Sequence, residues 1–293
     1  MNLLLLLLVP ACFALNPVIG RAMSEAFGPA SLSVTRWALS GLIIAVVAVG
    51  RGGAERWQAP AGLYVRLIAL GALGMGFCAY AAFAAARTTE ATNVGLIYAC
   101  TTPLVASYEI AAGRQRANWG LLAGIGACLA GVGIILTRGH PETLFNLTFS
   151  TGDLWAAAGM VVFAGYTVAL RRTPTALTPL AQFVIMSIGA TLALLPFCVD
   201  EVLARGGLPP ITLATLPWLA ILVLVAGIGA FLGYTLSLMR NGPVLTAASI
   251  SLTPIYAAAL AITLIGERLA WYHGVALALV VGGLLLINRG QGK

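Results

Sequence analysis

Hydroxyl-bearing side chains gather around two prolines that lie inside long apolar stretches of this sequence. Proline has no N–H group, so Pro103 and Pro254 each remove one helix hydrogen bond. The carbonyls that they free lie one turn earlier, at Ala99 and Ile250. Hydroxyls and freed carbonyls recognise a polar solute by hydrogen bonding. The hydroxyl-bearing residues that we expect to do so are Tyr98, Thr101, Ser249, Thr253 and Tyr256.

Helical spacing places these side chains on shared faces. Ser249, Thr253 and Tyr256 are separated by four and three residues, so they lie on one side of a helix. Tyr98 and Thr101 share a side for the same reason. Aromatic stripes stand in other stretches: Gly76 with Tyr80 and Phe83, Gly227 with Phe231 and Tyr234, Phe13 with Asn16, and Phe163 with Tyr166.

An aromatic stripe is more often helix packing than a ligand contact, and a proline can be a packing kink. Polar groups are costly in lipid, however, and these groups recur at similar depths in symmetric pairs. We therefore expect a shared aqueous cavity. Its predicted substrate-binding residues are Asn16, Tyr80, Phe83, Tyr98, Thr101, Phe163, Tyr166, Phe231, Tyr234, Ser249, Thr253 and Tyr256.

The two halves of the chain repeat each other at a nearly constant offset. Thr102-Pro103 recurs as Thr253-Pro254, displaced by 151 positions, and Gly76 recurs as Gly227 at the same displacement. Phe13, Arg21 and Pro29 recur after 150 positions as Phe163, Arg171 and Pro179. One unit has therefore been duplicated, and we expect a first repeat over residues 1–138 and a second over residues 152–293.

The composition identifies the unit as a membrane structure. The chain is 60% hydrophobic and 9% charged, with a mean hydropathy of +0.97. Apolar blocks of about 20 residues are long enough to cross the bilayer as helices. They predict an all-α membrane protein with ten transmembrane helices, near residues 3–22, 30–50, 63–86, 91–111, 118–137, 152–171, 179–199, 214–239, 243–264 and 271–288.

Five spans per repeat is an odd number, so the second unit enters the membrane from the other side. Such inverted-topology repeats are typical of transporters that expose a central site alternately to two faces. Pro103 lies about twelve residues into its helix, near the midplane, and Pro254 lies equally deep. We expect these two prolines to act in gating.

Lysine and arginine counts orient the chain. With a cytoplasmic N-terminus, ten of the sixteen basic residues lie inside and five or six lie outside, as the positive-inside rule requires. We expect a multi-pass protein of the bacterial inner membrane with both termini in the cytoplasm. The net charge of +7 is then an orientation signal, with no support for nucleic acid as a partner.

Other chemistry has little support in the sequence. The five cysteines fall within apolar spans without a metal-ligand spacing, and His140 and His273 lie in or beside outer loops. We therefore expect no enzyme activity, no metal and no cofactor. Small residues such as Gly120 and Gly124 predict close helix packing, within a monomer or at the seam of a weak homodimer.

Two segments resemble the drug/metabolite transporter superfamily and its EamA-type ten-helix members. One runs from Ala91-Thr92-Asn93-Val94-Gly95-Leu96 to Thr102-Pro103-Leu104, and the other from Val244-Leu245-Thr246-Ala247-Ala248 through Thr253-Pro254 to Gly266-Glu267-Arg268 and Gly282-Gly283. The glycine-acidic motif has decayed to Arg114-Gln115-Arg116 in the first half. The resemblance implies a cavity built by the first, third, fourth, sixth, eighth and ninth helices. It is greatest to the YddG-type exporters of aromatic and other neutral amino acids.

Missing charges narrow the expected substrate. Relatives that expel cationic drugs use a glutamate in the first helix, which has no acid here, and the single lysine is Lys293. Hydroxyls and aromatic rings suit a neutral or zwitterionic solute with an apolar side chain. We expect export of neutral, aromatic or hydrophobic amino acids, without an evident proton relay and so uniport-like. The alternative is a proton-coupled efflux pump for planar hydrophobic drugs.

Overall fold

The computed structural model describes residues 3–50, 57–114, 116–140, 150–173, 175–250 and 252–291. Every regular element in these ranges is a helix, as the apolar blocks predict. The first repeat contains α1 (Leu3–Ala22), α2 (Pro29–Gly50), α3 (Ala61–Leu70), η1 (Gly71–Phe77), α4 (Cys78–Ala85), α5 (Ala91–Ala99), α6 (Thr101–Ala111) and α7 (Trp119–Leu136). The second contains α8 (Thr151–Arg171), α9 (Pro179–Ala204), α10 (Leu216–Ala220), η3 (Ile221–Gly229), α11 (Ala230–Ile250), α12 (Thr253–Ile265) and α13 (Trp271–Gln291).

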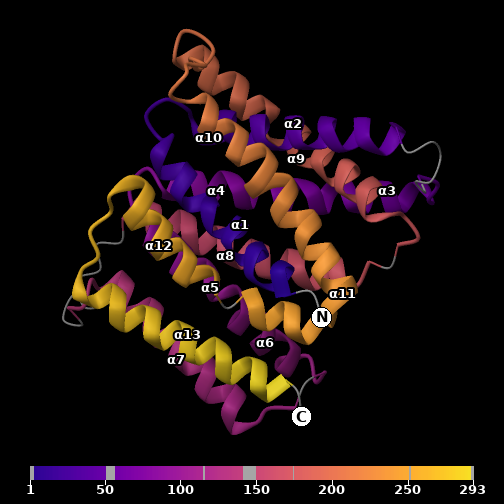
Figure 1. Cartoon of the computed structure of the whole chain (residues 1–293). Coiled ribbons are helices and arrows are strands. Elements are labelled where there is room, and N and C mark those ends of the chain that lie inside the picture. The colour runs from indigo at the N-terminus through magenta and orange to yellow at the C-terminus, as the bar shows by residue number, and fades with distance from the viewer. Residues whose placement is uncertain are drawn as a thin grey trace.

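In the described ranges the helices account for ten apolar stretches. Seven are long and apolar enough to cross a membrane, and three shorter ones are Trp119–Ile135, Thr253–Ile265 and Trp271–Ile287. The structure therefore has the predicted all-α architecture of ten helices in two inverted five-helix repeats. Both termini lie on one side, which we call the terminal side (Figure 1). The other side, which we call the opposite side, carries the connections 23–28, 86–90 and 266–270.

Local signals set several helix ends. The Asn118 side chain accepts a hydrogen bond from the Leu121 N–H and caps α7, and Ser150 and Thr178 cap α8 and α9 in the same way. Gly266 adopts a left-handed conformation, with φ 66°, at the end of α12. Polar caps and a glycine stop thus mark where the apolar stretches leave the membrane.

Two helices are interrupted directly before the repeated prolines. Cys100 separates α5 from α6, and Pro103 is the third residue of α6. In the second repeat α11 ends at Ile250, and Pro254 is the second residue of α12. Proline fits the first turn of a helix because the N–H there has no helical acceptor. The expected kinks are therefore breaks, and each fourth helix of a repeat consists of two segments.

The ninth span begins differently from the sequence prediction. Residues 240–242, where we expected the connection between the eighth and ninth spans, are helical and belong to α11. Consequently α11 holds the end of the eighth span and the first part of the ninth, and α12 holds the remainder.

The third helix of each repeat contains a π-helical segment. These are η1 in the first repeat and η3 in the second, and their residues correspond at the 151-residue offset of the repeats. The amino-acid pattern does not predict these segments, because helical periodicity does not distinguish a π turn from an ordinary α-helical turn. Such π turns occur often at functional sites.

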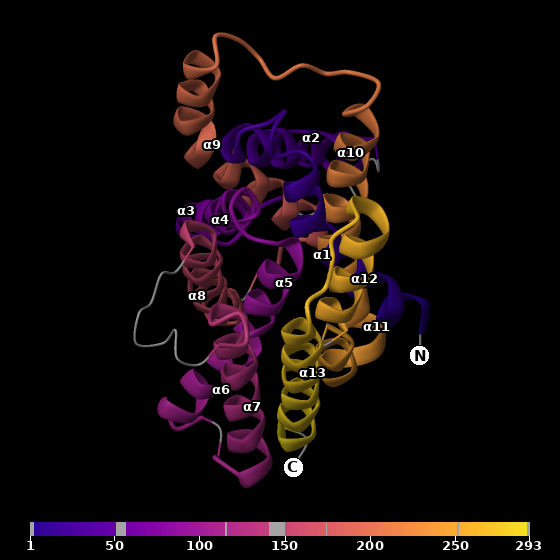
Figure 2. The ribbon, with the colours of Figure 1, turned by 90° about the vertical axis from the view of Figure 1, so that its left-hand side faces the viewer.

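Repeat-related helices pack as pairs. α2 packs on α9, and α7 packs on α13, as the two views also show (Figures 1 and 2). A Cβ added to Gly124 of α7 would lie 2.6 Å from the Gly283 oxygen of α13, so only glycine permits this approach. The expectation of close packing at small residues thus applies within this chain, between its fifth and tenth spans.

Candidate functional site

The first residues of α6 and α12 carry buried hydroxyls without a partner. The Thr101 and Thr253 hydroxyl oxygens are buried, and neither has a hydrogen bond within the described part of the chain. Both residues follow a helix break, where Leu104 and Ile255 donate the first N–H bonds of the new segments to the Cys100 and Leu252 carbonyls. An unpaired buried hydroxyl costs free energy, so a bound solute or water is the natural partner.

Asn16 presents a third unpaired oxygen. Its side-chain amide donates to the Phe13 carbonyl of its own helix at 2.9 Å, while the amide oxygen is buried and has no partner in the described residues. α1 packs on both α5 and α12, next to the two breaks. Unpaired oxygens therefore come from α1, α6 and α12. These helices belong to the first, fourth and ninth spans, to which the resemblance assigns part of the cavity.

Phe231 lies at the centre of an aromatic cluster, the Phe231 cluster. Its ring centroid is 5.2 Å from Trp37, 5.6 Å from Phe13 and 6.2 Å from Phe183. Tyr234 joins through an edge contact with Phe13 at 6.2 Å. The sequence predicts Phe231 and Tyr234 as site residues but not Trp37 and Phe183, which lie on the second and seventh spans.

Tyr80 belongs to a separate group of rings. Its centroid is 5.4 Å from Trp155 of α8 and 6.4 Å from Phe197 of α9. Phe83 is 1% exposed and packs against Gly20, since a Cβ at Gly20 would lie 2.8 Å from the Phe83 ring. The contacts between rings in the described residues thus do not bring Tyr80 or Phe83 against Phe231.

The other predicted tyrosines differ in their surroundings. The Tyr98 hydroxyl donates to the Cys78 carbonyl at 2.8 Å. Tyr166 is buried, stacks on Phe163 at 5.6 Å and covers Gly74, whose Cβ would clash with the ring. Tyr256 is half-buried, three residues after Thr253 on α12. Ser249 is buried near the end of α11, and Pro103 and Pro254 are buried beside the breaks.

Glu267 joins the two repeats on the opposite side. Its carboxylate accepts hydrogen bonds from the Ala91 N–H at 2.8 Å, the Thr92 N–H at 3.2 Å and the Thr92 hydroxyl at 2.5 Å. A carboxylate at these N–H groups satisfies the start of α5 and matches the helix dipole. The glycine-acidic motif therefore closes the α12 end onto α5.

Two more side chains of the second repeat hold the same end of α5. Asp153 accepts a hydrogen bond from the Thr89 hydroxyl at 2.8 Å. The His273 Nδ1 atom accepts from the Ala270 N–H, so its Nε2 atom carries a proton and lies 3.1 Å from the Asn93 amide oxygen and 2.8 Å from the Glu90 carboxylate. His273 lies beside the 266–270 connection, as the sequence predicts, and its side chain is buried in this contact.

Arg36 and Trp37 of α2 are residues that sequence reasoning missed. Arg36 is 3% exposed, lies about 10 Å along α2 from its first residue, and donates from Nη2 to the Ala226 carbonyl at 2.7 Å. The Trp37 ring NH donates to the Met75 carbonyl at 2.9 Å. In the sequence Arg36 is one basic residue within the second apolar stretch, and only the fold shows its acceptor.

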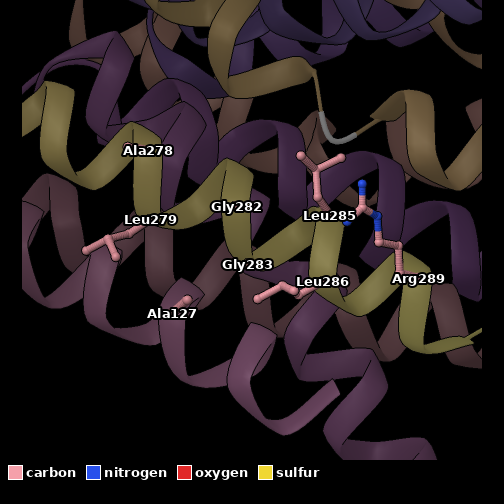
Figure 3. Close-up of a pocket in the computed structure, with 8 residues that line it drawn as sticks. All are labelled: Ala127, Ala278, Leu279, Gly282, Gly283, Leu285, Leu286 and Arg289. Carbon is pink, nitrogen blue, oxygen red and sulfur yellow. The ribbon is translucent and has the colours of Figure 1, made fainter. Parts of the chain in front are cut away.

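Two open grooves lie on the flanks of helix pairs. One, of about 380 Å³, follows α7 and α13 and is lined by small and aliphatic residues with Arg289 at one end (Figure 3). The other, of about 370 Å³, lies between α2 and α9. Both linings are mostly apolar, which fits contact with lipid tails, and Trp37 of the Phe231 cluster also lines the groove between α2 and α9.

Known protein families and structures that resemble this chain agree with this architecture. Residues 1–137 and 150–289 match the EamA-like transporter family. No curated protein sequence matches the chain. A solved crystal structure with 18% identity covers 97% of this chain and 98% of its own, with a TM-score of 0.62, and so shares the fold. With two matched segments that span nearly its whole length, the chain belongs to the EamA-like transporter family.

Proposed function

We propose that this protein exports neutral amino acids with apolar, chiefly aromatic, side chains by alternating access. The observation that carries the proposal is the set of unpaired buried oxygens on Asn16, Thr101 and Thr253. An amino acid has an ammonium group that donates hydrogen bonds to such oxygens, and its carboxylate accepts from the threonine hydroxyls. Nearby rings suit the apolar side chain.

The complete proposed binding site retains the residues expected from the sequence. The three unpaired oxygens bind the polar groups together with Tyr98, Ser249 and Tyr256. Rings on α4, α8 and α11 contact the side chain of the solute: Tyr80, Phe83, Phe163, Tyr166, Phe231 and Tyr234. The Tyr80 group and the Phe231 cluster each combine rings of both repeats, and we treat them as the two half-sites of one binding site.

Transport is proposed to be uniport-like. Among the described residues, the buried acid is Asp153, which lies in the first turn of α8 and accepts hydrogen bonds from the Thr89 and Ser150 hydroxyls. It therefore lies at the opposite-side end of its span and not at mid-membrane depth, where a proton relay across the membrane would need a carboxylate. The gradient of the solute itself then drives export.

Lysine and arginine counts assign the terminal side to the cytoplasm. The opposite side, where Glu267, Asp153 and His273 hold the start of α5, then faces outward. In this arrangement the described conformation is closed to the outside. The breaks before Pro103 and Pro254 allow the segments α6 and α12 to move while α5 and α11 stay in place.

Uptake into proteoliposomes tests the substrate class. Purified protein would be assayed with labelled tryptophan, phenylalanine, leucine, threonine, lysine and glutamate, against empty liposomes. The proposal predicts saturable flux for the neutral amino acids, fastest for the aromatic ones, and background flux for lysine and glutamate. Flux of a planar cationic dye without flux of any amino acid would instead support drug efflux.

A further inference from the structure

The two π-helical segments expose repeat-related carbonyls to one helix. A π turn widens the backbone and shifts its hydrogen-bond pattern, so carbonyls near it are available to side-chain donors. Met75 in η1 and Ala226 in η3 correspond at the 151-residue offset. Their oxygens accept from consecutive residues of α2, Trp37 and Arg36 respectively.

α2 is therefore bound to both repeats at equivalent points. Ser40, one turn further along α2, adds a hydrogen bond to the Val223 carbonyl of η3 at 3.0 Å. The Arg36 guanidinium also lies 4.2 Å from the centre of the Trp37 ring, which links the two donors to each other. We call Arg36 and Trp37 the α2 brace.

α9, the counterpart of α2, does not provide an equivalent brace. Its residues at the corresponding positions are Met186, Ser187 and Ala190, and the Ser187 hydroxyl bonds to the Phe183 carbonyl within α9. The backbone of α9 meets η1 through close contact instead, since a Cβ on Gly71 would lie 2.1 Å from the Met186 oxygen. The donors that reach both π-segments thus come from one helix.

A purely structural role explains Arg36 poorly. A guanidinium inside the membrane is costly, and a neutral donor would satisfy the Ala226 carbonyl at lower cost. The Arg36 Nε atom is buried and has no partner in the described residues, so the residue does not even use all its donors. A long, charged donor at this position therefore points to a function beyond packing.

We propose that Arg36 and Trp37 are positioning residues that tie η1 and η3 to α2, so that the third and eighth spans change conformation together. The two spans carry Tyr80 and Phe231, so linked movement would change both half-sites at once. This inference rests on the proposed alternation of the site, but its first test does not depend on any substrate.

Hydrogen–deuterium exchange of the purified full chain in detergent micelles provides that test. Trp37→Phe keeps a ring and removes the donor to η1. We expect exchange to become about threefold to tenfold faster in residues 71–77, as the loss of one hydrogen bond requires, and also in residues 221–229, which Trp37 does not bond. Arg36→Lys, which shortens the reach to Ala226, should accelerate both segments as well.

Ser33→Ala is the matched control, because Ser33 is buried in α2 and bonds to the Pro29 carbonyl of the same helix. It should leave exchange in both segments unchanged. If each variant accelerates only the π-segment that it touches, the two bonds are independent packing contacts and the proposal is wrong.

Transport gives a second, separable measurement. In proteoliposomes with tryptophan as the probe, Trp37→Phe and Arg36→Lys should lower the maximal rate severalfold while the half-saturating concentration stays the same. An unchanged rate with a raised half-saturating concentration would contradict a positioning role. If the wild-type protein does not transport tryptophan, the proposed substrate class is wrong. The exchange result still tests whether the α2 brace links η1 to η3.

Discussion

The Met75 and Ala226 carbonyl oxygens lie at equivalent positions of the two repeats, and both accept hydrogen bonds from neighbouring side chains of α2. One helix of the first repeat therefore holds the π-segments of both. An inverted repeat needs such links, because two independent halves would not open and close in a fixed order. The following predictions test this arrangement and the proposed site.

The first prediction concerns the closure of the opposite side. Glu267→Gln removes the negative charge that accepts from the Ala91 and Thr92 N–H groups. Because Glu267 is partly solvent-exposed, we expect a coupling of about 1 kcal/mol between Glu267→Gln and Thr92→Ala in a double-mutant cycle. Unfolding in mixed micelles with rising dodecyl sulfate measures it. The control is Glu109→Gln, which changes a carboxylate near the terminal side. Strictly additive effects of Glu267→Gln and Thr92→Ala would exclude the contact between Glu267 and Thr92.

The second prediction concerns the helix breaks. Replacing both Pro103 and Pro254 by alanine allows α5 to continue into α6, and α11 into α12, as uninterrupted helices. We expect the double variant to insert normally and to transport tryptophan at least tenfold more slowly. Pro196→Ala is the control, since Pro196 lies inside α9, away from the breaks. Wild-type rates in the double variant would show that the breaks are not used in gating.

A third prediction addresses proton coupling. Asp153, the buried acid of the described residues, lies at the opposite-side end of α8 and not at mid-membrane depth, so a pH gradient alone should not drive tryptophan above its equilibrium distribution. Proteoliposomes with an acidic or an alkaline interior should reach the same final internal concentration. Accumulation that a protonophore abolishes would show coupled exchange, and Asp153→Asn would then identify whether that carboxylate carries the proton.

The fourth prediction separates aromatic contacts from packing. An aromatic contact contributes about 0.5–1.5 kcal/mol beyond burial, which is about twofold to twelvefold in binding. Tyr80→Ala and Phe231→Ala should each lower the ratio of tryptophan to threonine transport by that factor. Trp119→Ala changes an exposed ring outside both groups and should leave the ratio unchanged. Equal losses for both substrates would mean that these rings only pack.

The sequence predicts the parts of this molecule that depend on local pattern. Apolar length identifies the spans, since the bilayer sets one thickness for all of them. The offset between Thr102-Pro103 and Thr253-Pro254 identifies the repeat, and the prolines mark where helical hydrogen bonding fails. These signals require no knowledge of which helices are neighbours.

Long-range partners were not predictable in the same way. Arg36 and Ala226 are 190 residues apart, and a lone arginine in an apolar stretch has the same pattern whether it faces lipid headgroups or a backbone carbonyl. The separation of the Tyr80 rings from the Phe231 cluster depends on how α4, α8 and α11 cross. Periodicity assigns a residue to a face, but not to the helix that covers it.

Trans-stimulation tests the central claim, that one site is exposed alternately to two sides, most directly. Proteoliposomes would be loaded with unlabelled tryptophan or with buffer, and entry of labelled tryptophan from outside would be measured. The account predicts that internal tryptophan accelerates entry severalfold and that entry saturates, because a loaded carrier returns faster than an empty one. Entry that rises linearly with concentration and ignores internal tryptophan would contradict alternating access.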